Sequence, residues 1–158
     1  MKSSLSSALL KAACVASWLL PISLAAQQAR VSVEPPAKIV AHPGSVLTEQ
    51  LKVAVQPGFH VNSDKPKDEY VIPLKLTWLS GPLTVESITY PKPEEIKVGT
   101  ELLTVFTGDF SIQSRFTVPR QVQPGSSVMT GKLRYQACNN QMCLRPATVE
   151  VHVPVVIE

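Results

Sequence analysis

The segment KLRYQACNNQMCLRPATVEVHV, residues 132–153, contains two runs in which apolar and polar side chains alternate. One run lies before a pair of cysteines and the other lies after it. Apolar residues at every second position are typical of a β-strand with one buried face and one face in water. The segment therefore predicts a β-hairpin with the cysteines at its tip. The apolar positions are Leu133, Tyr135, Ala137, Val149, Val151 and Val153.

The same alternation recurs earlier in the chain, in residues 51–55 and 72–78. Short turn signals rich in proline and glycine separate the alternating runs, and no segment shows the period of a helix. Seven or more short strands at this spacing predict an all-β domain, an immunoglobulin-like antiparallel β-sandwich. The turn signals are His42-Pro43-Gly44, Gln56-Pro57-Gly58, Ser80-Gly81-Pro82, Tyr90-Pro91, Thr107-Gly108-Asp109 and Gln123-Pro124-Gly125.

The N-terminal segment predicts export. Lys2 and Lys11 precede an uncharged run, residues 12–26, that ends in small side chains. This run is shorter than the roughly 20 apolar residues that a membrane-spanning helix needs. We therefore predict a cleaved signal peptide over residues 1–26 and a mature domain over residues 27–158. The mature domain is expected in the periplasm or otherwise secreted, without a stable membrane anchor.

Charge and composition exclude several classes of function. Removing Lys2 and Lys11 lowers the formal net charge from +3 to +1, and the remaining charges form no basic cluster that would bind nucleic acid. The three histidines lie far apart in sequence and match no metal-binding or hydrolase motif. We therefore expect no metal and no cofactor.

The two cysteines of the mature chain, Cys138 and Cys143, lie within one hexapeptide. In an oxidising compartment the default expectation is that they are bonded to each other. Between them, Asn139 and Asn140 are residue types that tolerate the left-handed backbone of a tight turn. Closing a loop of about six residues stabilises a fold by only about 2 kcal/mol, against about 4.7 kcal/mol for 100 residues. This placement favours a reactive pair, and a permanent structural bridge is the alternative.

The environment of the cysteines can be predicted in part. Continued alternation would put Cys138 on the polar side with Lys132 and Arg134, where its sulfur could be reached. Pro146 interrupts the run, so the same reasoning does not extend to Cys143. Arg134 and Arg145 are close enough in sequence to stabilise a thiolate.

The residues around this pair resemble a known family. Tyr135-Gln136-Ala137-Cys138, followed by Cys143 and Pro146, is similar to the active-site hairpin of the periplasmic N-terminal domain of DsbD, a thiol:disulfide interchange protein. Residues 58–62 resemble an early glycine-aromatic segment of that family, and the region after Tyr90-Pro91 resembles its cap loop. The resemblance covers residues 51–155. It implies an immunoglobulin-like fold with Cys138 and Cys143 as the active dithiol.

The resemblance also implies which side chains surround the dithiol. His60 and Asn62 stand where better-known members carry tyrosines. The cap region lacks the aromatic side chain that shields the disulfide in those relatives, and Ile96 or Val98 stands in its place. The expected neighbours of the active site are Phe59, His60, Asn62, Ile96, Val98, Tyr135 and Arg145.

The function that the resemblance implies is electron transfer. Such a domain passes reducing equivalents from a membrane-embedded thiol reductase to thioredoxin-fold periplasmic proteins, such as disulfide isomerases and cytochrome c maturation factors. Because the chain ends at Glu158, we expect it to act as a thiol:disulfide oxidoreductase only with separate partner proteins. We also expect a monomer. The alternative is a non-catalytic immunoglobulin-like binding or assembly module in which the Cys138–Cys143 bond is structural.

Overall fold

The computed structural model describes residues 29–158, which form twelve β-strands joined by turns and loops. These strands make three sheets of four strands each. The predicted signal peptide, residues 1–26, lies outside the described residues, as do residues 27 and 28. Within residues 29–158, no helix is long and apolar enough to cross a membrane.

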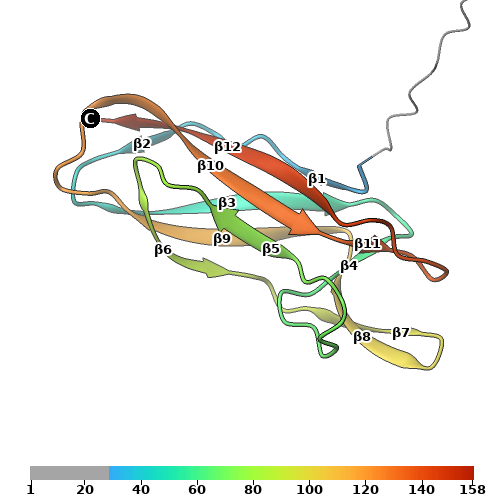
Figure 1. Ribbon diagram of the computed structural model, residues 1–158. Coiled ribbons are helices and arrows are strands. Elements are labelled where there is room, and N and C mark those ends of the chain that lie inside the picture. Colours follow the sequence, from blue (N-terminus) through green and yellow to red (C-terminus); the bar gives the residue numbers. More distant parts are fainter. Residues whose placement is uncertain (1–28) are drawn as a thin grey trace, which may run out of the picture.

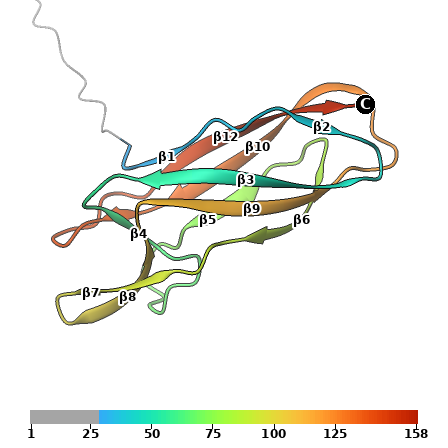
Figure 2. The same cartoon turned by 180° about the vertical axis from the view of Figure 1, so that it is seen from behind.

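Two of the sheets pack face to face and form what we call the body of the molecule. Figures 1 and 2 show them from opposite sides as two layers of long strands. This arrangement confirms the prediction of an all-β sandwich. The first sheet, in the order β1-β3-β9-β6, consists of β1 (Val31–Val33), β3 (Val46–Val55), β9 (Asp109–Thr117) and β6 (Thr84–Thr89). The second, in the order β2-β12-β10-β5, consists of β2 (Ile39–Ala41), β12 (Ala147–Ile157), β10 (Gly125–Tyr135) and β5 (Lys75–Trp78).

The third sheet, which we call the small sheet, lies at one end of the body (Figure 1). Neighbouring strands are antiparallel in all three sheets, except that β2 runs parallel to β12. The small sheet has the order β11-β4-β8-β7, from β11 (Ala137–Cys138), β4 (His60–Asn62), β8 (Glu101–Phe106) and β7 (Glu94–Val98).

The core lies between the two sheets of the body, where the alternating apolar side chains meet. Phe116 on β9 is fully buried, and the ring of Trp78 on β5 packs edge-on against it at 5.1 Å between centroids. The indole Nε1 of Trp78 donates a hydrogen bond to Ser114 Oγ at 2.9 Å. This bond satisfies the polar groups that the ring and the serine bring into the core. A Cβ on Gly131 would lie 2.9 Å from the Trp78 ring, so the contact between β10 and β5 requires glycine there.

The strand predicted over residues 72–78 is shorter than expected, because β5 begins only at Lys75. Pro73 has no N–H to donate to a neighbouring strand. The Ile72 carbonyl instead accepts a hydrogen bond from the Asn62 side chain, 3.0 Å from its Nδ2. Residues 63–74 therefore form a loop that crosses the small sheet rather than extending the body.

Strand β12 runs the length of the body. It begins four residues after Cys143 and ends at the opposite end of the molecule, where the C-terminus lies (Figure 1). At about 3.3 Å per residue, its 11 residues span about 36 Å. The cysteine hairpin and the C-terminus are thus at opposite ends of the same strand.

Candidate active site

The two cysteines form a disulfide across the tip of the hairpin that joins β11 to β12. Their Cα atoms are 4.0 Å apart, and the two residues also form an antiparallel β-bridge. The expected pairing of Cys138 with Cys143 is therefore present.

The turn between the cysteines is held by a side chain. Asn139 Oδ1 accepts hydrogen bonds from the backbone N–H groups of Gln141 and Met142, both at 2.9 Å. No residue other than glycine has a positive φ within residues 29–158, so neither asparagine uses the left-handed backbone that this residue type tolerates. Asparagine is suited to the turn for a different reason, because its side-chain oxygen replaces a backbone acceptor.

Further hydrogen bonds tie the two arms of the hairpin together. The N–H of Leu144 donates to the Ala137 carbonyl at 2.8 Å, and Gln136 Nε2 donates to the Leu144 carbonyl at 3.0 Å. These bonds flank the disulfide on the side of the body. They connect the two hairpin arms independently of the S–S bond itself.

The two cysteines differ in their exposure to solvent. Cys138 is 3% exposed, whereas Cys143 is an exposed residue. The prediction that the Cys138 sulfur can be reached is therefore wrong. Its physical reason is a change of partner strand at Gln136: β10 pairs with β12, whereas β11 pairs with β4. Both residues of β11 are buried, so its two faces are both covered.

The register of the small sheet separates its buried side chains into two faces. Ala137 lies opposite Val61, and Val61 lies opposite Phe106, and all three belong to the main hydrophobic core. Directly opposite residues share a face and neighbours along a strand alternate. Cys138 and its opposite residue His60 therefore lie on the other face, which we call the outer face of the small sheet.

The outer face continues across β8 to the cap hairpin formed by β7 and β8. Asn62 lies opposite Val105 on this face, and both are buried. Ile96 and Val98 are half-buried and lie on the same face, but on β7. Two strands separate them from Cys138, and three strand spacings amount to about 14 Å. The sheet thus places these two predicted neighbours on the face of the disulfide without bringing them beside it.

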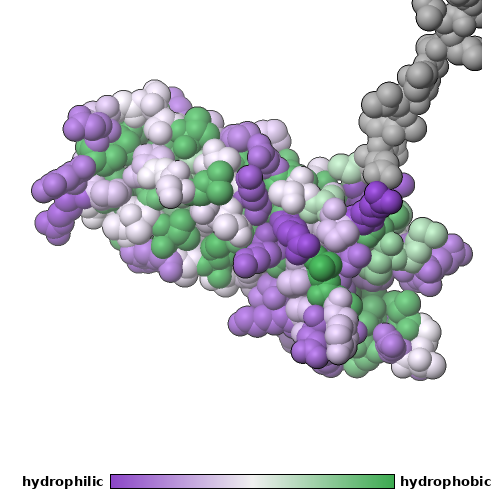
Figure 3. Space-filling model, in the orientation of Figure 1, coloured by the Kyte–Doolittle hydropathy of each residue, from purple (hydrophilic) through white to green (hydrophobic). Residues whose placement is uncertain are grey.

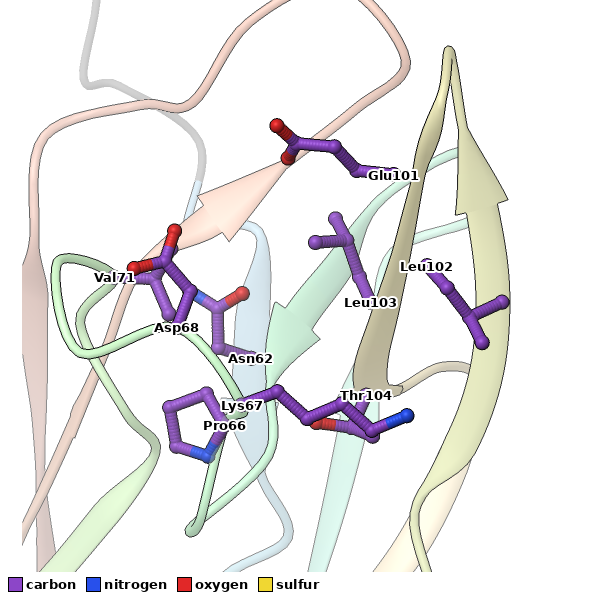
Figure 4. Close-up of a pocket in the computed structure, with 9 residues that line it drawn as sticks. All are labelled: Asn62, Pro66, Lys67, Asp68, Val71, Glu101, Leu102, Leu103 and Thr104. Carbon is purple, nitrogen blue, oxygen red and sulfur yellow. The ribbon is translucent and has the colours of Figure 1, made fainter.

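A pocket of about 280 Å³ opens between the cap hairpin and the loop 63–74. In Figure 4, Leu103 and Asn62 point toward Val71 and Asp68 across this pocket. An ion pair between Lys67 Nζ and Glu95 Oε1, at 2.7 Å, links the loop to β7. The hydrogen bond from Lys67 also holds the pKa of the exposed Glu95 below its usual value.

A second cavity, of about 510 Å³, lies beside Cys143, and we call it the Cys143 groove. Its apolar wall includes Tyr135, and burial raises the pKa of that phenol above its usual value. Two arginines, Arg30 and Arg145, also line it. Positive charge near a cysteine favours its thiolate form, so this groove is suited to an attacking or leaving sulfur at Cys143.

Arg30 was not foreseen from the sequence. Its guanidinium lies 4.7 Å over the ring of Phe59 and donates a hydrogen bond to Gln56. This stacking connects the predicted neighbour Phe59 to the groove. Arg30 is more than 100 positions from the cysteines and precedes any alternating run, so no local pattern marks it. Arg134, which was expected near the thiolate, is exposed on β10 and does not line the groove.

His60 is 4% exposed, and this burial lowers the pKa of its imidazole below the usual value of about 6.5. A buried imidazole with a lowered pKa is neutral at pH 7 and has a free acceptor nitrogen. Within residues 29–158, no three His, Cys, Asp or Glu side chains are grouped so that they could hold a metal ion.

Exposed apolar side chains occur at this end of the molecule. Met142 at the hairpin tip is 60% exposed and Leu102 on the cap hairpin is 51% exposed. Figure 3 shows hydrophobic surface gathered over β7 and β8, next to the hairpin tip. Apolar surface beside an accessible disulfide is typical of a site that contacts another protein.

Comparisons with known proteins agree with this geometry. The family described as "Thiol:disulfide interchange protein DsbD, N-terminal" matches residues 27–154. No curated protein sequence matches the chain. Among solved structures, the N-terminal periplasmic domain of ScsB from Proteus mirabilis is similar, with a TM-score of 0.53 and 14% sequence identity. That match covers 78% of this chain and 44% of the ScsB chain, so this chain spans less than half the length of that structure.

Two further structures are similar at lower scores. The DsbD N-terminal domain of Neisseria meningitidis in its reduced form has a TM-score of 0.38 and 15% identity, over 66% of this chain and 74% of that one. The seventh ScaB type I cohesin of Pseudobacteroides cellulosolvens has a TM-score of 0.47 and 11% identity, over 81% of this chain and 92% of that one.

The family match extends over most of the chain and includes both cysteines of the disulfide hairpin. The ScsB domain shows that the sandwich fold is shared with a solved structure. The chain belongs to the family of the N-terminal domain of the thiol:disulfide interchange protein DsbD.

Proposed function

We propose that this domain carries electron pairs in the periplasm through the Cys138–Cys143 dithiol, between a membrane-embedded thiol reductase and thioredoxin-fold proteins. The observation that carries the proposal is the asymmetry of the disulfide: Cys143 is an exposed residue in a groove lined by two arginines, and Cys138 is a buried residue. A structural bridge does not need this asymmetry, whereas thiol–disulfide exchange needs one reachable sulfur and one that resolves the intermediate.

We assign the partner-facing role to Cys143. In the reducing direction, a partner thiolate attacks Cys143 Sγ, the Cys138–Cys143 bond breaks, and Cys138 leaves with the electron pair. The partner's second thiolate then attacks its own sulfur in the mixed disulfide and releases Cys143. The partner becomes a disulfide, and the domain gains two electrons and, in total, two protons. The reverse sequence reduces a client disulfide.

The Cys143 groove supports a preference among partners. Arg30 and Arg145 line the groove together with Cys143, and the adjacent residue Met142 adds exposed apolar surface. A partner whose reactive cysteine is flanked by a carboxylate and apolar side chains would complement this surface in charge and polarity. We therefore propose that acidic thioredoxin-fold surfaces dock here. The predicted signal peptide over residues 1–26 supports a periplasmic location for this domain, where it would meet such partners.

The reduction potential of the disulfide tests the proposal. The mature chain, residues 27–158, is equilibrated in glutathione redox buffers, and free thiols are counted by mass tagging. Structural disulfides lie below about −300 mV, whereas labile and catalytic ones lie higher. A value well above this limit, with fast exchange against a thioredoxin-fold protein, is expected. A lower value with slow exchange would show a structural clip, and the binding-module alternative would replace the proposal.

A further inference from the structure

When Cys138 leaves as a thiolate, its charge develops inside the protein. Cys138 is 3% exposed, and a buried charge without a partner is costly. In the opposite direction, a buried Cys138 thiol must lose its proton before it can attack Cys143. The resolving sulfur therefore needs a proton-exchanging group within the buried part of the small sheet, and this need rests on the proposed function.

His60 is placed to meet this need. It lies directly opposite Cys138 in the antiparallel pair of β4 and β11, and both side chains are on the outer face. Directly opposite residues have Cβ atoms about 4.5–5.5 Å apart, which is within the reach of an imidazole nitrogen to a sulfur. We infer that His60 is the proton acceptor for Cys138 when that sulfur closes the disulfide, and its proton donor when the disulfide opens.

The other groups on this face do not provide an alternative base beside the sulfur. Thr107, the residue after β8, donates a hydrogen bond through its hydroxyl to Glu94 Oε2 at 3.0 Å. Glu94 lies on β7, and two strands separate it from Cys138. The loop 63–74 contacts the sheet through Asn62, which is two residues from His60 along β4, and through the ion pair of Lys67 with Glu95 on β7. The titratable groups of the outer face besides His60 are Cys138, Glu94 and Glu101, and those of the loop 63–74 are Asp64, Lys65, Lys67, Asp68, Glu69 and Tyr70.

The protonation state of His60 agrees with this role. Burial lowers its pKa, so the imidazole is neutral and able to accept a proton at pH 7. In the closing step, the Cys138 thiol gives its proton to the imidazole, and the thiolate attacks Cys143 Sγ. The bond between Cys143 and the partner sulfur breaks, the partner leaves as a thiolate, and the imidazolium returns the proton to that thiolate or to water. Atoms and charge are conserved, and the partner is the group that is reduced.

The test separates the two cysteines in time. Reduced mature chain is mixed with one equivalent of dithiodipyridine, whose released thiopyridone is coloured. The first release reports attack by Cys143, and the second reports closure by Cys138. His60→Gln is compared with His152→Gln, the same change at an exposed histidine on β12.

We expect His60→Gln to slow the second release about 100-fold at pH 7, a typical contribution of general acid–base catalysis. The first release and the His152→Gln control are expected to match wild type. In wild type, the second rate should stay constant down to the lowered pKa of His60. In His60→Gln it should instead follow ionisation of the Cys138 thiol and recover only at alkaline pH, because burial disfavours the thiolate.

A merely structural role for His60 would change the rate without moving this pH profile. A second release in His60→Gln with the rate and profile of wild type overturns the inference. If His60→Gln does not fold, the wild-type profile decides alone, because a second rate that rises only at alkaline pH, with ionisation of a thiol, also overturns it. If wild type never makes the second release, the proposed dithiol exchange fails as well, which is a distinguishable result.

Discussion

In the body of the molecule, β10 and β12 pair over eleven residues, whereas in the small sheet β11 and β4 pair over two. The difference extends to what is buried. The buried residues of the body are aliphatic and aromatic, apart from Ser114, which is hydrogen-bonded to Trp78. The small sheet and the start of its loop bury His60, Asn62 and Ser63. The long strand pairs of the body bury apolar side chains and stabilise the fold. The short strand pairs of the small sheet bury polar side chains at the end of the molecule that carries the disulfide.

The comparison explains why the reactive pair is attached to the small sheet. Buried polar groups contribute little net stability and are costly if unsatisfied. A short sheet that depends on the body for its position can hold them without endangering the fold. If this division is correct, changes at the two ends should affect different measurements.

The largest effect is expected for Cys143→Ser. Exchange with dithiodipyridine through the exposed sulfur should be lost completely, because no other reachable thiol remains in the mature chain. The free energy of unfolding should fall by only about 2 kcal/mol relative to the oxidised wild type, the value for a loop of this length. Thiol release and urea denaturation measure the two quantities. An unfolded variant would show that the disulfide is a staple and would remove the contrast between the two regions.

The next largest effect is a difference in the free energy of unfolding between a variant of the body and a variant of the small sheet. Phe116→Ala removes a fully buried ring from the body and should cost about 3–5 kcal/mol. Leu103→Ala removes a half-buried side chain from the small sheet and should cost on the order of 1 kcal/mol. The folded fraction of each should exchange disulfides at the wild-type rate. Equal costs for the two changes would mean that the small sheet carries as much of the fold as the body.

A smaller effect is expected from the charge of the Cys143 groove. Arg145→Glu should slow reduction of oxidised glutathione, an anionic disulfide, by roughly tenfold at low salt, because like charges reduce the encounter rate. Salt should diminish the difference, since it screens exposed charges. Arg120→Glu, the same change at an exposed arginine in the loop between β9 and β10, is the matched control. An equal loss in both variants would point to net charge rather than to the groove.

The smallest expected effect is the dependence of stability on pH. The pKa of His60 is lowered in the folded state, so the unfolded chain binds its proton more readily. The contribution is present above about pH 6.5, the unfolded value. It should be lost as pH falls through the folded pKa. His60→Gln should flatten this part of the profile in urea denaturation, whereas His152→Gln should not. A wild-type stability that is constant between pH 7 and 5 would contradict the buried, neutral imidazole.

The body could be predicted from the sequence because each of its long strands repeats one local rule. Leu133 and Val151 are buried because apolar side chains at every second position meet the facing sheet. The family could be predicted from a few residues around Cys138 and Cys143. Both predictions use information that lies within a few positions in the chain.

The details of the site depend on contacts that no local pattern contains. Cys138 is buried because β11 pairs with β4, whereas the preceding strand β10 pairs with β12. Alternation of apolar and polar residues alone cannot show such a change of partner strand. Arg30 reaches the groove through a fold that brings β1 next to the hairpin arm. Asn139 stabilises the turn through hydrogen bonds to its side chain, whereas the preferences of asparagine had drawn attention to the left-handed backbone.

Strand β12 separates the cysteine hairpin from the C-terminus, and this separation can be used in experiments. Because the chain leaves the body about 36 Å from the hairpin, a biotin or affinity tag placed after Glu158 would tether the domain by its far end. On a biosensor surface, every copy would then present Cys143 to the flowing solution. Partner docking could thus be recorded kinetically, with no interference from the chemistry of attachment.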